Sequence, residues 1–275
     1  MPPMSRVTVT MEALRLQKRK ALIAYLCVGD PSHDESVALA CAAVDAGADM
    51  LELGVPFSDP TADGPAIARA SQRAIAGGGG LLMTLRAAEA IRREKPEVPI
   101  ILFGYYNPLF VRGEGRMVGE ASAAGVDALL VVDLPVEESF PLRALAMARG
   151  IGVIPLLAPT SSKERVAAVK QSRAEHGVLF VYYVSVAGVT GSASSPLAEA
   201  SQEAGRLRAE LGAPVVVGFG VDSAEKARAA GAHADGVVVG TAIVRRIEEE
   251  KTLAARHASV TRLVASLRAG LDACL

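Results

Sequence analysis

Residues 214–244 read PVVVGFGVDSAEKARAAGAHADGVVVGTAIV, in which two short valine-rich runs flank a segment rich in alanine and charge. Each run is apolar without alternation, which is typical of a strand covered on both faces. The segment between them opens at Ser223, a residue type that favours a helix N-cap, and it is long enough for a crossover helix. We therefore predict a strand, a helix and a second, parallel strand in this stretch.

The same unit recurs along the chain. Six further apolar runs, each followed by a turn rich in Gly, Pro, Asp or Ser, occupy residues 21–29, 49–56, 98–107, 127–135, 152–159 and 177–185. Segments of helical period, such as LLMTLRAAEAIRREK (81–95) and SSKERVAAVKQSR (161–173), separate them. A doubly wound sheet also alternates strand and helix, but eight units in 275 residues without a composition shift fit a closed barrel better. The prediction is an α/β fold in which residues 1–275 form a single (β/α)8 TIM barrel domain.

Both ends of the chain carry helical signals outside the eight units. Residues 11–20 predict an extra N-terminal helix before the first strand. Near the other end, six apolar residues fall on one helical face and are expected to close the outer layer of the barrel: Leu253, Val260, Leu263, Val264, Leu267 and Leu271.

Charge excludes two classes of partner. Lysine and arginine number 29 and acidic residues 30, which gives a formal net charge of −1, and the two signs are interleaved. Nucleic acid and anionic membranes require a basic face, so neither is expected as a partner. A small neutral or anionic ligand fits this charge balance better.

Cysteine and hydropathy patterns indicate a cytoplasmic protein. Three cysteines, Cys27, Cys41 and Cys274, form no CxxC pair, and the four histidines form no metal-binding motif, so we expect neither disulfides nor a metal site. No apolar run reaches the roughly 20 residues of a membrane span, and the N-terminus is too polar for a signal peptide.

The stretch LELGVPFSDPTADGP (51–65) places one acid inside an apolar run and two in the following turn. Glu52 shares a strand face with Met50 and Gly54, which is the barrel interior if the register is right. A buried carboxyl group has a shifted pKa, so Glu52 is either a proton-transfer group or a structural acid paired with a neighbouring strand. Asp63 is either a second catalytic carboxylate or a turn residue, and Asp59 suits the turn role better.

Glycines at the ends of the last two strands predict a phosphate site. Gly220 precedes a helix, and Gly240 and Thr241 precede another, so backbone N–H groups can approach an anion there. Gly188, Thr190 and Gly191, in a loop that is long enough to act as a lid, strengthen this interpretation. The alternative is that these glycines only shape tight turns.

Four motifs, in this order and spacing, identify a resemblance: LELGVPFSDPTADGP (51–65), YYVSVAGVTG (182–191), GFGV (218–221) and ADGVVVGTAIV (234–244). The chain resembles the tryptophan synthase alpha-subunit family from residue 21 to the final helix. The resemblance implies a (β/α)8 barrel that cleaves indole-3-glycerol phosphate to indole and glyceraldehyde 3-phosphate. This carbon–carbon lyase reaction of tryptophan biosynthesis is a retro-aldol cleavage without a cofactor.

The resemblance also assigns roles to residues. Glu52 matches the family's general acid and base, Asp63 matches the carboxylate that holds the indole N–H, and Tyr182 matches a tyrosine at the site. Gly191, Gly220, Gly240 and Thr241 match the phosphate cradle. An apolar wall that suits an indole ring is expected from Tyr25, Phe103, Tyr105, Leu130 and Ile67.

Finally, the resemblance implies a partner. The family's alpha subunit works beside a beta subunit, as an α2β2 heterotetramer, and receives no cofactor itself, because pyridoxal phosphate belongs to the beta subunit. Thr61, Val186 and Ala24 depart from the usual family pattern, and the first two lie in loops where closure and coupling to the partner could be altered. Two alternatives stay open: a free-standing lyase that needs no beta subunit, and a non-catalytic, phosphate-binding regulatory protein.

Overall fold

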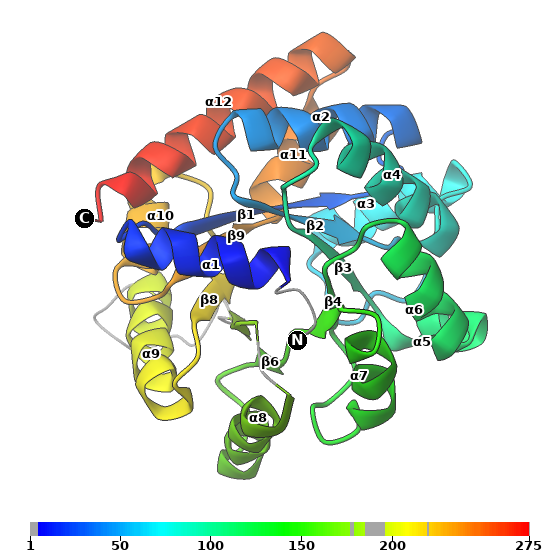
Figure 1. Ribbon diagram of the computed structural model, residues 1–275. Helices are drawn as coiled ribbons and strands as arrows, with labels where there is room; N and C mark the ends of the chain where they lie inside the picture. Colours follow the sequence, from blue (N-terminus) through cyan, green and yellow to red (C-terminus); the bar gives the residue numbers. More distant parts are fainter. Residues whose placement is uncertain (1–4, 177–178, 185–195, 219, 275) are drawn as a thin grey trace.

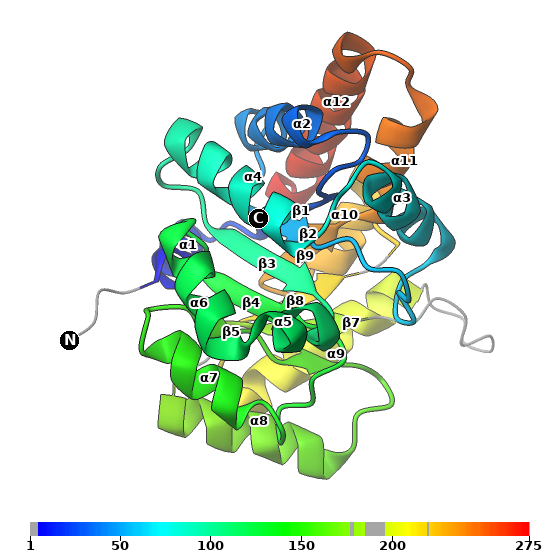
Figure 2. The same ribbon diagram turned by 90° about the vertical axis from the view of Figure 1, so that its right-hand side faces the viewer.

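The computed structural model describes residues 5–176, 179–184, 196–218 and 220–274, within which helices and strands alternate (Figures 1 and 2). The strands are β1 (Ala21–Cys27), β2 (Met50–Gly54), β3 (Ile100–Gly104), β4 (Ala128–Val131), β5 (Gly152–Val153), β6 (Leu156–Leu157), β7 (Val181–Val184), β8 (Val215–Gly218) and β9 (Gly236–Val239). The helices are α1 (Arg6–Leu16), α2 (His33–Asp45), α3 (Pro65–Ala76), α4 (Leu81–Glu94), α5 (Tyr106–Arg112), α6 (Glu114–Ala123), α7 (Phe140–Met147), α8 (Lys163–His176), α9 (Pro196–Leu211), α10 (Ala224–Gly231), α11 (Thr241–Glu249) and α12 (Leu253–Asp272).

All neighbouring strands are parallel, in the order β5-β4-β3-β2-β1-β9-β8-β7-β6. The two outermost strands, β5 and β6, are consecutive in the chain and are separated only by Ile154 and Pro155. These two residues continue the ladder, because the Ile154 N–H donates to Leu129 of β4 (2.8 Å) and the Tyr182 N–H of β7 donates to Pro155 (3.0 Å). The sheet therefore closes into the predicted TIM barrel.

The fifth predicted strand is divided in two. The run at residues 152–159 predicts one strand, but the structure has β5 and β6 with Pro155 between them. Proline has no N–H to donate, so one ladder hydrogen bond is missing at Pro155 although its carbonyl accepts one, and the run is divided into two strands.

Side chains alternate between two cores. In β1, Ile23 and Tyr25 point into the barrel, whereas Leu22 and Leu26 pack outward under the helices. Three residues of α1, Val7, Met11 and Leu14, belong to the inner core, and Figure 1 shows α1 crossing the sheet. The extra N-terminal helix thus covers one end of the barrel.

Two predictions about the terminal helices need correction. The first helix spans Arg6–Leu16 rather than residues 11–20, because Ser5 caps it and the chain turns at Lys18, where φ is 56°. In α12, the predicted apolar face is buried from Val260 to Leu271, but Leu253 is 43% exposed. Leu253 is the first residue of α12, and helical period alone does not indicate whether a neighbour covers a helix end.

Three aspartates lock the ends at which the strands begin. Asp127 precedes β4. Its N–H donates a hydrogen bond to the carbonyl of Ile100 (2.9 Å), and its carboxylate accepts one from the N–H of Ile100 (2.9 Å). Asp49 repeats this reciprocal pair with Leu22, before β2. Asp235 repeats it with Val215, before β9. Each aspartate therefore fixes the register between its own strand and the preceding one.

A helix arginine neutralises each of these carboxylates. Arg268 pairs with Asp49 (3.0 Å), Arg92 with Asp127 (2.7 Å) and Arg208 with Asp235 (3.1 Å). Because Asp127 is only 6% exposed, its buried negative charge needs a partner of opposite charge, which Arg92 supplies. Arginine and aspartate together bind the outer helices to the start of the sheet.

We predict that Asp127→Ala lowers the free energy of unfolding by about 3–5 kcal/mol, because it removes the carboxylate that pairs with Arg6 and Arg92 and leaves the Ile100 N–H without its acceptor. Asp127→Asn keeps an acceptor and should lose less. Urea unfolding measures both, with the exposed Glu97→Ala as the control. Equal stability of Asp127→Ala and the control would show that the pair is dispensable.

Candidate active site

A cavity of about 490 Å³ opens at the ends where the strands finish. It is lined by Tyr25, Glu52, Ile67, Phe103, Tyr182, Gly220, Val221, Asp222, Lys226, Val238, Gly240, Thr241, Ala242, Arg245, Arg246, Glu249 and Leu263. Glu52 and the aromatic side chains lie at its inner end, and the starts of α10 and α11 form its outer end. The cavity therefore joins the predicted acid and the predicted phosphate end.

Glu52 is buried in the barrel without a partner. It stands in β2 between Tyr25 of β1 and Ile101 of β3, and it is 1% exposed. Neither carboxyl oxygen has a hydrogen-bond partner among the described residues, so the alternative of a structural acid paired with a neighbouring strand finds no support there. Burial raises the pKa of Glu52 from 4.5 to about 8, so the group is protonated at neutral pH.

Asp63 is held by a tyrosine. The hydroxyl of Tyr105 donates to Asp63 Oδ2 (3.1 Å) and accepts the N–H of Ala62 (2.9 Å), while the Tyr105 ring packs on Phe57 at 5.0 Å. Burial raises the pKa of Asp63 to about 6, and the hydrogen bond from Tyr105 opposes this shift. The two acids thus have different pKa values, as division of acid and base work requires.

Two glycines make room for two tyrosines. A Cβ on Gly54 would lie 2.4 Å from the Tyr25 hydroxyl oxygen, and a Cβ on Gly218 would lie 2.0 Å from that of Tyr182. Both hydroxyl groups therefore rest against the backbone of a neighbouring strand. The sequence analysis missed this fit, although a glycine at a strand end is the signal that reveals it.

The charge of Asp63 reaches these tyrosines. Burial raises the pKa of Tyr25 and of Tyr182 well above the ordinary value, and the negative charges of Glu52 and Asp63 add to the rise in both. Asp63 itself does not line the cavity wall, although its charge acts on these two tyrosines of the wall.

The outer end of the cavity has the features of an anion site. Gly220 has a φ of 73°, a conformation that favours glycine, and α11 begins at Thr241 directly after Gly240. The N-terminus of a helix presents unpaired N–H groups and a positive dipole to the cavity. This end can therefore hold a phosphate group.

Basic side chains at this end were missed by the sequence analysis. Lys226 lies in the first turn of α10 and pairs with Asp222 (2.8 Å), and Arg245 and Arg246 of α11 also line the cavity. Arg245 makes no ion pair within the part of the chain that the structure describes. Of these three, Lys226 is the one near a helix N-terminus, where a cation is unfavourable unless an anion is bound, and this was the available signal.

Comparison with known proteins decides the family. The family model described as tryptophan synthase alpha chain matches residues 11–271. The tryptophan synthase alpha chain of Geotalea daltonii is 44% identical over 98% of this chain and 100% of its own length. That of an Azoarcus species is 45% identical over 98% of this chain and 97% of its own length. The chain belongs to the tryptophan synthase alpha chain family.

Solved structures of the same family share the fold. The crystal structure of tryptophan synthase subunit alpha from Legionella pneumophila matches with a TM-score of 0.88 and 35% identity, covering 98% of this chain and 99% of that one. A chain of tryptophan synthase from M. tuberculosis matches with a TM-score of 0.84 and 34% identity, covering 97% and 99%. The closed barrel is thus the tryptophan synthase alpha fold.

Some of the predicted site residues do not line the cavity. Tyr105 contacts Asp63 instead. Leu130 belongs to the inner core and does not line the cavity, although its register partner Phe103 does. Gly191 and the predicted lid at residues 188–195 lie outside the described residues. Asp59 accepts a hydrogen bond from the Ser58 hydroxyl (2.5 Å), and its role as a turn residue stays a prediction.

Two negative findings apply to the described residues only. None of their His, Cys, Asp and Glu side chains forms a group of three or more that could hold a metal ion. Within the same ranges, no helix combines the length and the apolar character needed to span a membrane.

We predict that Glu52→Gln removes a pH-dependent loss of stability. Because the folded pKa of Glu52 is about 8 and its ordinary value is 4.5, the wild type loses stability as the pH rises through this window, on the order of a few kcal/mol. Urea unfolding at pH 5 and pH 9 should show a larger decrease for the wild type than for Glu52→Gln. The same decrease in both proteins would contradict the burial of an unpaired carboxyl.

Proposed function

We propose that this chain cleaves indole-3-glycerol phosphate to indole and glyceraldehyde 3-phosphate, with Glu52 and Asp63 as its catalytic groups. The observation that carries the proposal is a buried carboxyl group without a hydrogen-bond partner among the described residues. It lies at one end of a cavity whose other end is a helix N-terminus. A substrate with an apolar ring and a phosphate group fits between these ends. Membership of the tryptophan synthase alpha chain family supports the same reaction.

The first step is proton transfer to the ring. Protonated Glu52 donates its proton to the indole carbon that bears the glycerol phosphate side chain. Positive charge then develops on the ring nitrogen, and the carboxylate of Asp63 accepts a hydrogen bond from that N–H. With pKa values of about 8 and about 6, Glu52 is the acid and Asp63 the ionised group near neutral pH.

The second step breaks the carbon–carbon bond. Glu52, now ionised, takes the proton of the side-chain hydroxyl adjacent to the ring. The O–H electrons form the aldehyde carbonyl, the electrons of the broken bond return to the ring, and neutral indole leaves. Glu52 is protonated again, so the proton balance closes without a cofactor.

The remaining cavity residues bind the two ends of the substrate. Tyr25 and Phe103, in edge contact at 5.2 Å, offer an apolar wall to the ring together with Ile67 and Tyr182. Gly220, Gly240 and Thr241 present backbone N–H groups to the phosphate, with Lys226 and Arg245 nearby. Gly191 stays a predicted member of this cradle.

A beta subunit in an α2β2 heterotetramer is part of the proposal, with pyridoxal phosphate held by that subunit only. Supporting this, α5 exposes Phe110 (62%) and Val111 (77%), and its N-cap residue, Tyr105, holds Asp63. A partner that covers these side chains would contact the element that positions Asp63. A cytoplasmic location completes the proposal, because the described cysteines are free thiols.

We predict that Glu52→Gln lowers indole formation by about 100- to 10,000-fold and that Asp63→Asn lowers it by about 100-fold, since the first removes the proton donor and the second the charge beside the ring nitrogen. Asp59→Asn, in the same loop, is the matched control and should retain activity. An indole assay measures all three.

Substantial turnover by Glu52→Gln would contradict the role of Glu52 as the proton donor. Near-normal turnover by Asp63→Asn would indicate that Asp63 is a turn residue. A wild type that makes no indole, alone or with a beta subunit, would favour the non-catalytic alternative.

We predict that a beta subunit accelerates the reaction by about 5- to 150-fold, the usual range of coupling between sites. Glyceraldehyde 3-phosphate is the product to measure, because the partner takes up indole. Equal rates with and without the beta subunit would indicate a free-standing lyase.

A further inference from the structure

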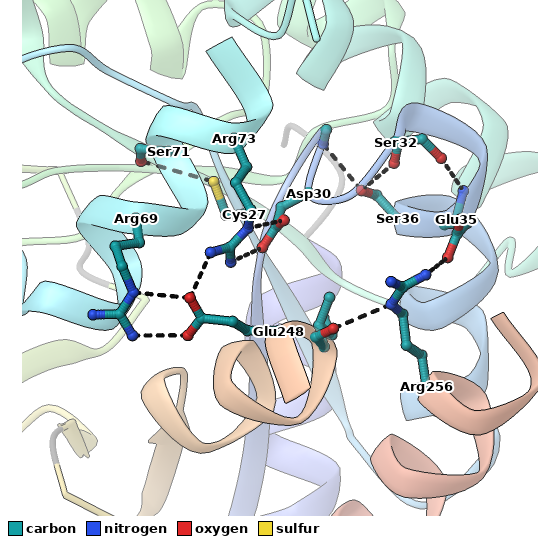
Figure 3. Close-up of polar contacts among 12 residues, drawn as sticks. Cys27, Asp30, Ser32, Glu35, Ser36, Arg69, Ser71, Arg73, Glu248 and Arg256 are labelled. Carbon is teal, nitrogen blue, oxygen red and sulfur yellow. Dashed lines mark hydrogen bonds and ion pairs between the residues drawn. The ribbon is translucent and has the colours of Figure 1, made fainter. Parts of the chain in front are cut away.

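Three elements around the cavity meet at one arginine (Figure 3). Arg73 of α3 donates to both carboxylate oxygens of Asp30, each at 2.8 Å. The same guanidinium donates to Glu248 of α11 at 2.7 Å. Arg73 therefore links the loop after β1, helix α3 and helix α11.

Each linked element carries part of the proposed active site. Helix α3 begins at Pro65, so it starts immediately after Asp63 and the cap residue Gly64. Helix α11 begins at Thr241, at the phosphate end, and β1 carries Tyr25. The position of α3 relative to α11 therefore sets how far Asp63 lies from the phosphate cradle.

The contacts have the geometry of a rigid joint. Asp30 is 3% exposed, and its two parallel hydrogen bonds with Arg73 define the plane of the guanidinium. The hydrogen bond from Arg69 and the charge of Arg73 hold the pKa of Glu248 down at about 2, so Glu248 stays ionised at neutral pH. A buried ion pair adds little net stability. The effect of the Arg73–Asp30 pair is therefore to fix the orientation of the two side chains.

The same end of α11 is also anchored from a second side (Figure 3). Arg256 of α12 donates to the carbonyl of Ile247 (3.1 Å) and pairs with Glu35 of α2 (2.7 Å). Helix α11 thus has one fixed contact toward α12 and α2, and Glu248 links it to α3 through both Arg69 and Arg73. Of these two arginines, Arg73 also binds Asp30 in the loop after β1.

We propose that Arg73 and Glu248 are positioning residues that set the separation between the Asp63 end and the phosphate end of the cavity. The inference rests on the proposed function, in which one substrate of fixed length contacts both ends. A displacement of about 1 Å between these ends can cost about 100-fold in rate, because the ring is no longer aligned with Glu52. A ligand that contacts only one end is insensitive to this separation.

The experiment compares Arg73→Lys with Arg69→Lys. Lysine keeps the charge but loses the two parallel hydrogen bonds. Arg69 is the matched control, because it also binds Glu248 (2.8 and 2.7 Å) and lies one turn away in α3. Arg69→Lys leaves the joint of α3 and α11 with the loop after β1 in place, because Arg73 still binds both Asp30 and Glu248. Glu248→Gln is the second variant, since it weakens the link to α11 and leaves the Arg73–Asp30 pair in place.

Three quantities are measured for each protein: kcat and KM for indole-3-glycerol phosphate, the competitive inhibition constant of inorganic phosphate, and Tm. Inorganic phosphate contacts only the α11 end. For Arg73→Lys and Glu248→Gln we expect kcat to fall about 10- to 100-fold while the phosphate inhibition constant changes less than about twofold. Arg69→Lys should keep kcat within about threefold of the wild type.

An unchanged kcat in Arg73→Lys and Glu248→Gln, or a loss of phosphate affinity in proportion to the loss of kcat, would overturn the positioning role. An equal loss of kcat in Arg69→Lys would do the same. If Arg73→Lys does not fold, Glu248→Gln alone decides. A wild type without lyase activity would contradict the proposed function and this inference together, whereas an active wild type with insensitive variants contradicts only the inference.

Discussion

The closed sheet removes the carboxyl group of Glu52 from water without giving either oxygen a hydrogen-bond partner among the described residues. A buried carboxyl in this situation keeps its proton, and burial raises its pKa to about 8. The rest of the site depends on this constraint. Apolar and aromatic neighbours maintain it. A second acid, Asp63, is less buried; burial raises its pKa only to about 6, and the hydrogen bond that Tyr105 donates opposes this rise.

The two ends of the barrel have separate tasks. Where the strands begin, Asp49, Asp127 and Asp235 fix register and bind arginines from the outer helices. Where the strands finish, glycines replace side chains, so that Tyr25 and Tyr182 lie against the backbone and helix N-termini reach the cavity. The contacts that stabilise the barrel thus lie where the strands begin. The end where the strands finish can therefore hold an anion site and an acid without a hydrogen-bond partner among the described residues.

Distant segments must keep fixed positions for such a cavity to work. Tyr105, the cap of α5, holds the loop that carries Asp63, and Arg73 joins that loop's helix to α11. The exposed side chains Phe110 and Val111 lie on the same α5. A partner that covers α5, as proposed, would therefore act on the loop of Asp63 from one side, and the ion pairs at Arg73 act on it from the other.

The sequence by itself determined the repeated strand and helix units, the inward face of Glu52 and the glycine-rich ends of the last two strands, because these follow from local period and residue type. Only the tertiary structure decided that Glu52 has no partner among the described residues, that Pro155 divides the fifth strand and that Leu253 is exposed. It also decided which charges meet, since Arg73 and Glu248 lie 175 positions apart in the chain. Contacts over such separations depend on how the barrel closes, and no local pattern encodes that distance.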